Sequence, residues 1–116
     1  NTFIEKRKKI AEMYDKGITN SKIIKPHVNK NNEHVYHLYV VASKNRDSIL
    51  KIMKKNKIEL GIQYPYPIHK MLAYKDSTYT KLKNTENFSK QIFSLPIYPT
   101  LEKVKIKKII KIINKI

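Results

Sequence analysis

Two prolines separated by a single residue set the strongest constraint on how this chain folds. They lie in residues 60–69, which read LGIQYPYPIH. Proline has no amide hydrogen, fixes its own φ, and biases the residue before it toward extended conformations. The stretch therefore cannot be an ordinary helix, and it makes a poor central strand. We predict a stiff, extended loop that leaves a short strand through Gly61.

The predicted loop carries side chains that commonly bind ligands, namely Gln63, Tyr64, Tyr66 and His69. Binding residues tend to lie on loops that a rigid scaffold holds in place. The same pattern also fits a rigid connection that has no binding role. The residues of the loop alone leave both interpretations open.

Apolar side chains at helical spacing predict four helices, over residues 2–16, 46–56, 86–93 and 101–116. Gly17 is predicted to end the first helix in a left-handed conformation, which glycine tolerates best. Asn45, Thr85 and Thr100 are the predicted N-caps of the other three helices. A short helical turn is predicted over residues 70–75. The last helix has the clearest buried stripe, with isoleucines at 106, 109, 110, 113 and 116.

β-Branched and aromatic residues fill residues 35–41, which predicts a strand covered on both faces. Residues 58–62 are predicted to form a second strand, and residues 95–99, with two prolines, an edge strand. Residues 19–33 and 76–84 are predicted loops, the first anchored by Ile23 and Ile24. Strands that alternate with helices predict one two-layer α/β (α+β) domain over residues 1–116.

The net charge of +16 is the most extreme feature of the composition, with 25 basic residues against 9 acidic ones. Such a charge favours binding to nucleic acid or to an anionic membrane. However, only Arg7 and Arg46 supply the forked guanidinium that reads guanine edges and clamps phosphates. We therefore interpret most of the lysines as a solvated surface. A small basic nucleic-acid-binding protein, with eight tyrosines for stacking, is the alternative.

The same composition excludes several kinds of site. The absence of cysteine excludes disulfides, thiolate zinc sites and cysteine nucleophiles. With only Gly17 and Gly61, the chain has neither a P-loop nor a dinucleotide fingerprint. No apolar run is long enough to span a membrane and no signal peptide is apparent, so we expect a cytoplasmic protein without a membrane partner. Because the chain opens on Asn1 inside a predicted helix, we expect it to be a piece of something longer.

The four histidines do not form a metal-binding pattern. His34 and His37 are three residues apart, which places them on opposite faces of a strand, and we expect no metal. His37, in the middle of the predicted strand, is predicted to be a hydrogen-bonded packing residue. No glycine-rich elbow presents a serine nucleophile near His69. The residues therefore do not predict a self-contained enzyme.

A series of short motifs runs in a fixed order from the first predicted helix to the last. They are Arg7…Ala11…Tyr14, HVYHLYVV at 34–41, NRD at 45–47, GIQYP at 61–65 followed by Pro67 and His69, Ala73-Tyr74, NTE at 84–86, and SLPIYP at 94–99. Together they closely resemble the carboxy-terminal domain of the DegT/DnrJ/StrS family of pyridoxal-phosphate-dependent sugar-nucleotide aminotransferases. The resemblance covers essentially the whole chain.

The resemblance implies the small carboxy-terminal domain of a fold-type I enzyme, with a short, mostly antiparallel sheet covered by helices. It also implies a homodimer that moves an amino group, usually from glutamate, onto a keto-sugar attached to a nucleotide. The lysine that joins pyridoxal phosphate, and the main contacts to this cofactor, belong to a large domain that the chain lacks. We therefore expect no catalytic or cofactor-binding residue here, and no activity from the chain alone. A non-catalytic remnant or interaction domain is a further alternative.

In the family, the proline loop reaches the mouth of the active site beside the sugar nucleotide. The resemblance therefore implies that Tyr64, His69 and Gln63 bind the substrate. Gln63 stands where the family more often has histidine, although glutamine can also donate and accept hydrogen bonds. Lys83 stands where the family tends to have proline, which we interpret as a loop change without functional weight.

Overall fold

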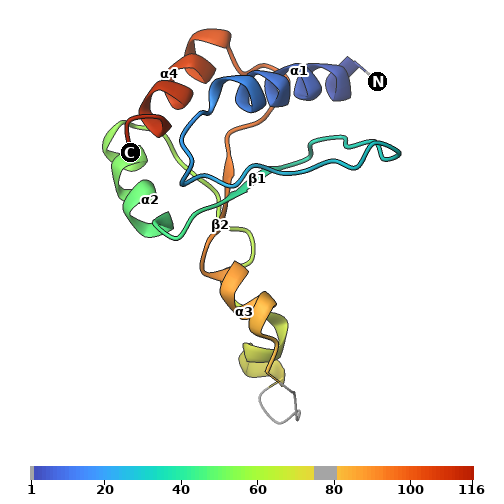
Figure 1. Ribbon diagram of the computed structural model, residues 1–116, viewed down its shortest axis with the longest axis vertical. Coiled ribbons are helices and arrows are strands. Elements are labelled where there is room, and N and C mark those ends of the chain that lie inside the picture. The colour runs from blue at the N-terminus through green and yellow to red at the C-terminus, as the bar shows by residue number, and fades with distance from the viewer. Residues whose placement is uncertain (1, 75–80) are drawn as a thin grey trace.

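The computed structural model describes residues 2–74 and 81–116 (Figure 1). The described residues form four α-helices, two short strands and two 3-10 turns, η1 and η2. Their bounds, in chain order, are α1 (Thr2–Gly17), β1 (Tyr39–Ala42), α2 (Arg46–Lys55), η1 (Ile68–Lys70), η2 (Leu72–Tyr74), α3 (Lys83–Ser89), β2 (Ile92–Leu95) and α4 (Lys103–Ile113).

The sheet is antiparallel, and its centre is the pair β1 and β2, in which Tyr39 lies opposite Leu95 and Ala42 opposite Ile92. A single backbone bridge extends it at each side, from Ile24 to Ala42 and from Gly61 to Ser94. Helices α1 and α4 pack against each other on one side of this sheet, and α2 lies near one end (Figure 1). This arrangement confirms the predicted α/β fold class.

Two tyrosines form the centre of the core. Tyr14 of α1 and Tyr39 of β1 are fully buried, and their ring centroids are 5.0 Å apart. The Tyr14 hydroxyl donates a hydrogen bond to the carbonyl oxygen of Pro96 at 2.7 Å, and the Tyr39 hydroxyl donates to the Asp15 carboxylate. Around them pack the other large buried side chains: Ile10, Ile18, Ile23, Val41, Ile49, Met53, Phe93, Leu95, Leu101, Ile106, Ile109 and Ile113.

The helices with the most regular apolar spacing are confirmed. α1 and α2 occupy nearly the predicted spans, and α4 buries Ile106, Ile109 and Ile113 as predicted. α4 begins at Lys103, after an extended Glu102, so the prediction that Thr100 is its N-cap is wrong. Asn45 precedes α2 but its side chain makes no capping hydrogen bond.

Gly17 ends α1, but it does not adopt the predicted left-handed conformation, because no glycine has a positive φ. The structure gives another reason for glycine at this position. A Cβ atom here would lie 2.7 Å from Cδ1 of Ile110 in α4. Glycine therefore allows the end of α1 to approach α4 closely.

The strand predicted over residues 35–41 begins later in the structure, so the prediction is wrong for its first four residues. Tyr36 has a φ of 48°, which no strand residue adopts, and its amide donates to the Nδ1 atom of His34 at 2.9 Å. The strand therefore starts only at Tyr39. Val40 is exposed, so one face of the strand is not covered as predicted. His37 is exposed in the bend before the strand, which contradicts its predicted role in packing.

The helix predicted over residues 86–93 is displaced. α3 ends at Ser89, and Ile92 and Phe93 belong to strand β2 instead. Thr85 lies inside α3 rather than at its N-cap, and Phe88 is exposed rather than buried. The edge strand predicted over residues 95–99 overlaps the observed strand β2 only at Leu95, which pairs with Tyr39 of β1.

The remaining predictions concern loops and short elements. The strand predicted over residues 58–62 is limited to the bridge at Gly61. Ile23 is buried, whereas Ile24 anchors the first loop only through its backbone pairing with Ala42. The helical turn predicted over residues 70–75 is found as η1 and η2. In the loop predicted over residues 76–84, residues 76–80 lie outside the described residues, and 83–84 belong to α3.

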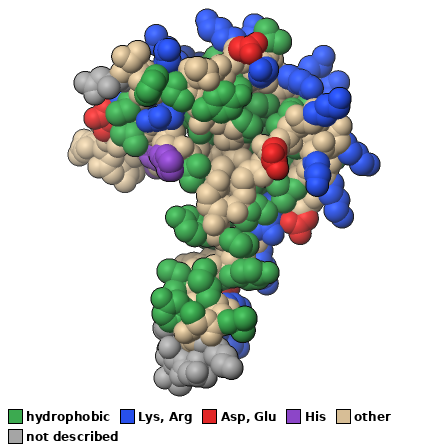
Figure 2. Space-filling view, turned by 180° about the vertical axis from the view of Figure 1, so that it is seen from behind, with side chains coloured by type: hydrophobic (Ala, Val, Ile, Leu, Met, Phe, Trp, Pro, Cys, Tyr) green, Lys and Arg blue, Asp and Glu red, His purple; other side chains and the backbone are tan. Residues whose placement is uncertain are grey.

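The molecule has a body and an arm (Figure 1). We define the arm as residues 63–74 and 81–91, which include η1, η2 and α3, and the body as the other described residues. None of the three short helices of the arm contains a buried residue. The arm joins the body through a narrow neck (Figure 2). No helix in the described ranges is long and apolar enough to cross a membrane.

Candidate substrate loop on the arm

Gln63 stands at the base of the arm, where the chain leaves the sheet. Its Oε1 atom accepts a hydrogen bond of 2.8 Å from the hydroxyl of Ser94, a residue that is almost fully buried in β2. Gly61 permits this contact, because a Cβ atom there would lie 2.6 Å from Nε2 of Gln63. Gly61 pairs with the backbone of Ser94 in both directions, at 3.1 and 2.8 Å. These bonds fix the start of the loop.

Tyr64 and Tyr66 are presented outward by the loop. Their side chains are 69% and 66% exposed, respectively. Each ring precedes a proline, so its backbone has little freedom to lose when a ligand binds. A phenol can donate and accept hydrogen bonds and can stack on a flat group. These two side chains are therefore available for a ligand or for another protein surface.

His69 lies in η1 and connects the loop to α3. Its side chain is only 10% exposed, and its Nε2 atom lies 3.2 Å from Oε1 of Glu86. The Nζ atom of Lys70 lies 2.7 Å from the other carboxylate oxygen of Glu86. These hydrogen bonds, from Lys70 and then from His69, hold the pKa of Glu86 below its usual value. We call these three residues the clasp.

The structure thus separates the three predicted substrate residues into two kinds. Tyr64 faces outward, whereas Gln63 and His69 are engaged by Ser94 and Glu86. Sequence reasoning missed Ser94 and Glu86 as partners, although both belong to motifs that carried the family resemblance. The loop is also less extended than predicted, because it enters a 3-10 turn at Ile68.

The cavity beside the loop is too small for a nucleotide-sugar. Gln63, Gly61 and Ser94 line a groove of about 200 Å³, and small-molecule sites usually have about 300 Å³ or more. The described part of the chain also does not fit pyridoxal phosphate. It contains no buried lysine, whereas the cofactor needs an enclosed one. Within it, no three His, Asp or Glu side chains gather as a metal site would require.

Solved structures of sugar aminotransferases share this fold. DesV from S. venezuelae, in complex with a ketimine intermediate, superposes with a TM-score of 0.92 at 26% identity, covering 97% of this chain and 31% of that chain. A DegT DnrJ EryC1 StrS aminotransferase from Brucella abortus superposes with a TM-score of 0.88 at 28% identity, with the same coverage. The fold is therefore that of part of an aminotransferase.

Sequence comparison gives the same result. Residues 1–114 match the DegT/DnrJ/EryC1/StrS aminotransferase family. The dTDP-3-amino-3,6-dideoxy-alpha-D-galactopyranose transaminase of Aneurinibacillus thermoaerophilus is 30% identical over 96% of this chain. The dTDP-3-amino-3,4,6-trideoxy-alpha-D-glucose transaminase of Micromonospora megalomicea is 34% identical over 87% of it. The chain belongs to the DegT/DnrJ/EryC1/StrS aminotransferase family, which is pyridoxal-phosphate-dependent. It spans 31% and 29% of the lengths of these two relatives.

Proposed function

We propose that this chain is the small carboxy-terminal domain of a pyridoxal-phosphate-dependent aminotransferase acting on a nucleotide-linked keto-sugar, with glutamate as the amino donor. The match of residues 1–114 to the family is the observation that carries this proposal. Three of the relatives are named as transaminases or aminotransferases of dTDP-linked and UDP-linked sugars, which supports a nucleotide-sugar as the substrate. In this proposal, parts of the enzyme outside this chain determine which sugar is used and which carbon receives the amino group.

The catalytic lysine and the cofactor belong, in this proposal, to a large domain of the same enzyme. The small groove beside Gln63 supports this division, because its walls enclose too little volume for the substrate. The chain alone is then inactive. Incubation of the 116-residue chain with pyridoxal phosphate, glutamate and a keto-sugar nucleotide should yield no amino sugar. Product formation by the chain alone would contradict the proposal.

Tyr64 is the residue we propose to contact the nucleotide-sugar. It is exposed, it stands on a loop stiffened by two prolines, and its hydroxyl can bond to a sugar or a phosphate oxygen. Gln63 and His69 serve the same substrate mainly by holding the loop, through Ser94 and Glu86. We treat these two as positioning residues, since their described contacts are made within the chain.

The exposed apolar surface of the arm supports the proposal that a second domain or subunit covers it. Tyr66, Ile68, Leu72 and Phe88 are each more than half exposed, and the arm's helices bury nothing. A contiguous apolar surface of this kind usually marks an interface. We propose that a homodimer and its large domains cover the arm, and that this contact brings Tyr64 to the active site.

The loop is tested in an enzyme that joins this chain to a family large domain. Tyr64→Phe should raise KM for the nucleotide-sugar by about threefold to tenfold, the value of one hydrogen bond, without changing the cofactor's absorbance. Tyr36→Phe, which removes a hydroxyl from the body, is the matched control and should leave KM unchanged. Loss of cofactor binding in Tyr64→Phe, or an unchanged KM, would contradict the assigned role.

A further inference from the structure

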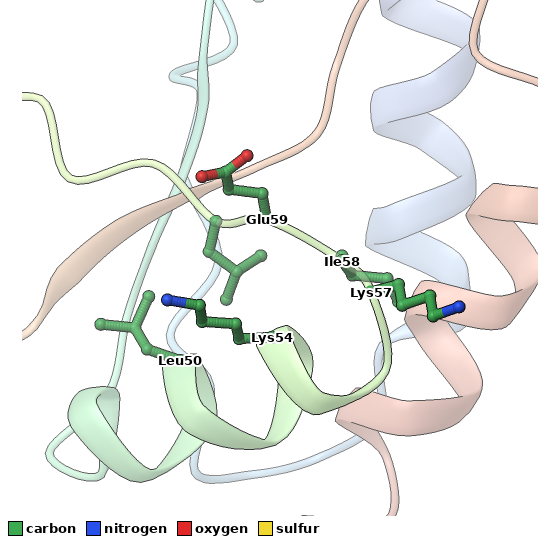
Figure 3. A pocket seen from close by; sticks show the side chains of 6 residues that line it. Leu50, Lys54, Lys57, Ile58 and Glu59 are labelled. Carbon is green, nitrogen blue, oxygen red and sulfur yellow. The ribbon is translucent and has the colours of Figure 1, made fainter.

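Two grooves meet at the turn that follows α2. They share Lys57, Ile58 and Glu59, which form the wall between them. Figure 3 shows the first groove, in which Lys54 and Lys57 extend in opposite directions and Lys57 points toward α4. The second, which we call the α4 groove, has a volume of about 370 Å³. Its lining comprises the shared residues together with Pro96, Tyr98, Leu101, Lys105, Lys108 and Ile109.

The α4 groove combines an apolar floor with a basic rim. Leu101 and Ile109 belong to the buried core, whereas Tyr98, which also lines the groove, is 45% exposed. Lys57, Lys105 and Lys108 line the groove, and the only acidic residue among the lining residues is Glu59. An aromatic ring beside several ammonium groups suits a flat group that carries negative charge.

The three lysines differ in how they are engaged. Lys105 forms an ion pair with Glu102 at 2.8 Å, and Lys108 donates to the carbonyl oxygen of Asn56 at 3.2 Å. Across the described residues, no ion pair or side-chain hydrogen bond involves Lys57. The ammonium group of Lys57 can therefore bind an anion without breaking an existing contact.

The backbone at Lys57 adds an independent reason to assign a role to this side chain. Lys57 has a φ of 59°, in the left-handed region that favours glycine. It closes α2 in a Schellman motif, in which the amide of Ile58 bonds to the carbonyl of Met53 and that of Lys57 to the carbonyl of Lys54. A lysine thus occupies a position where glycine would be less strained. Non-glycine residues in such conformations concentrate at ligand sites.

We propose that the α4 groove binds a nucleoside diphosphate. The base stacks on Tyr98 above the apolar floor, and the phosphates lie against Lys57, Lys105 and Lys108. The Glu59 carboxylate accepts hydrogen bonds from the ribose hydroxyls. The volume of the groove falls within the range of small-molecule sites, about 300 to 1,000 Å³. No residue of the Tyr64 loop lines the α4 groove, although Glu59 and Pro96 line both it and the small groove beside Gln63. We treat this site as additional to the proposed substrate site.

The experiment is calorimetric titration of the intact chain with ADP, adenosine and pyrophosphate at about 0.15 M salt, where surface charges are screened beyond about 8 Å. ADP should bind once per chain and at least about tenfold more tightly than either part, because it alone uses both the ring and the lysines. ADP binding no tighter than pyrophosphate would overturn the proposal and indicate an unspecific basic surface. An absence of ADP binding would overturn it as well.

Variants locate the site. Lys57→Gly removes the ammonium while relieving backbone strain, so the weakened ADP binding expected of it, about threefold, cannot come from unfolding. Tyr98→Ala should weaken ADP binding about tenfold, whereas Tyr98→Phe keeps the ring and the affinity. Lys105→Ala should act like Lys57→Gly. Lys107→Ala, on the same helix but outside the groove, is the control, and an equal loss in this variant would overturn the proposal.

The two proposed sites are distinguished by one further variant. Tyr64→Phe should leave ADP binding unchanged, because Tyr64 lies on the arm and does not line the α4 groove. Loss of ADP binding in Tyr64→Phe would place the nucleotide on the arm and overturn the assignment to the α4 groove. Retained ADP binding supports the α4 groove whether or not amino transfer is found.

Discussion

Replacing Lys57 by glycine should stabilise the protein, although it removes a side chain. The structure places Lys57 in the left-handed conformation directly after α2, with a φ of 59°. A residue with a Cβ atom pays roughly 1 to 2 kcal/mol for this conformation, and glycine does not. Against this gain stands the larger conformational entropy of glycine in the unfolded chain, worth about 0.5 to 1 kcal/mol.

The expected net gain in the free energy of unfolding is therefore about 0.5 to 1 kcal/mol. Little is lost with the side chain itself, since no described ion pair or side-chain hydrogen bond uses its ammonium group. Urea unfolding followed by far-ultraviolet circular dichroism measures the gain. With a slope of about 1 to 2 kcal/mol per molar urea, the midpoint should rise by about 0.5 M.

Lys54→Gly is the matched control, one turn earlier on the same helix. Lys54 lies inside α2 and is exposed, so glycine there should lower the free energy of unfolding by about 1 kcal/mol. The same chemical change should thus have opposite effects at two positions three residues apart. A midpoint that falls in Lys57→Gly as it does in Lys54→Gly would refute the reasoning from backbone strain.

Three further predictions concern the core and the arm. Tyr14→Phe leaves the Pro96 carbonyl without its hydrogen bond and should lower the free energy of unfolding by about 1 to 3 kcal/mol. The urea midpoint measures this loss, and a loss below about 0.5 kcal/mol would contradict the role of this bond. Burial raises the pKa of Tyr14, and burial followed by the bond to Asp15 raises that of Tyr39. These tyrosines stay protonated in the folded state at a pH where tyrosines of the unfolded chain ionise, so the free energy of unfolding should fall as the pH rises above about 10. It should fall less steeply in Tyr14→Phe, and an equal dependence on pH in the two proteins would be inconsistent with this cause. Glu86→Gln weakens the clasp and should lower the protection of amides in α3, but not in α4, against hydrogen exchange. Acidification below the usual carboxyl pKa of about 4.3 should lower the same protection, measured relative to the intrinsic exchange rate at each pH, because the lowered pKa of Glu86 means that its ionised form is the bound one. Unchanged exchange in α3 would exclude the clasp as the support of the arm.

The elements that sequence predicted well are those whose pattern is local and regular. α4 repeats isoleucine at helical spacing, and α2 has a short apolar stripe between charged ends, so periodicity alone defines both. The boundary between α3 and β2 was misplaced because Ile92 and Phe93 are compatible with either element. They form a strand because they pair with β1, which is distant in the sequence.

Other features depend on contacts that no local pattern contains. β-Propensity favours a strand from Val35, but Tyr36 turns into the left-handed region beside His34, and the strand starts later. The same holds for the site. The loop and its prolines were evident from the sequence, whereas Gln63 meets Ser94 across 31 residues and His69 meets Glu86 across 17. Such pairs become visible only when the chain is folded.

The central claim is that this chain supplies the small domain of a nucleotide-sugar aminotransferase. It is tested most directly by joining the chain to a large domain of the family and measuring amino transfer from glutamate to a dTDP-linked or UDP-linked keto-sugar. We predict an amino-sugar product from the joined enzyme and none from either part alone. If the large domain alone forms the product at the same rate, or if the joined enzyme binds pyridoxal phosphate and no keto-sugar nucleotide is aminated, the claim is contradicted.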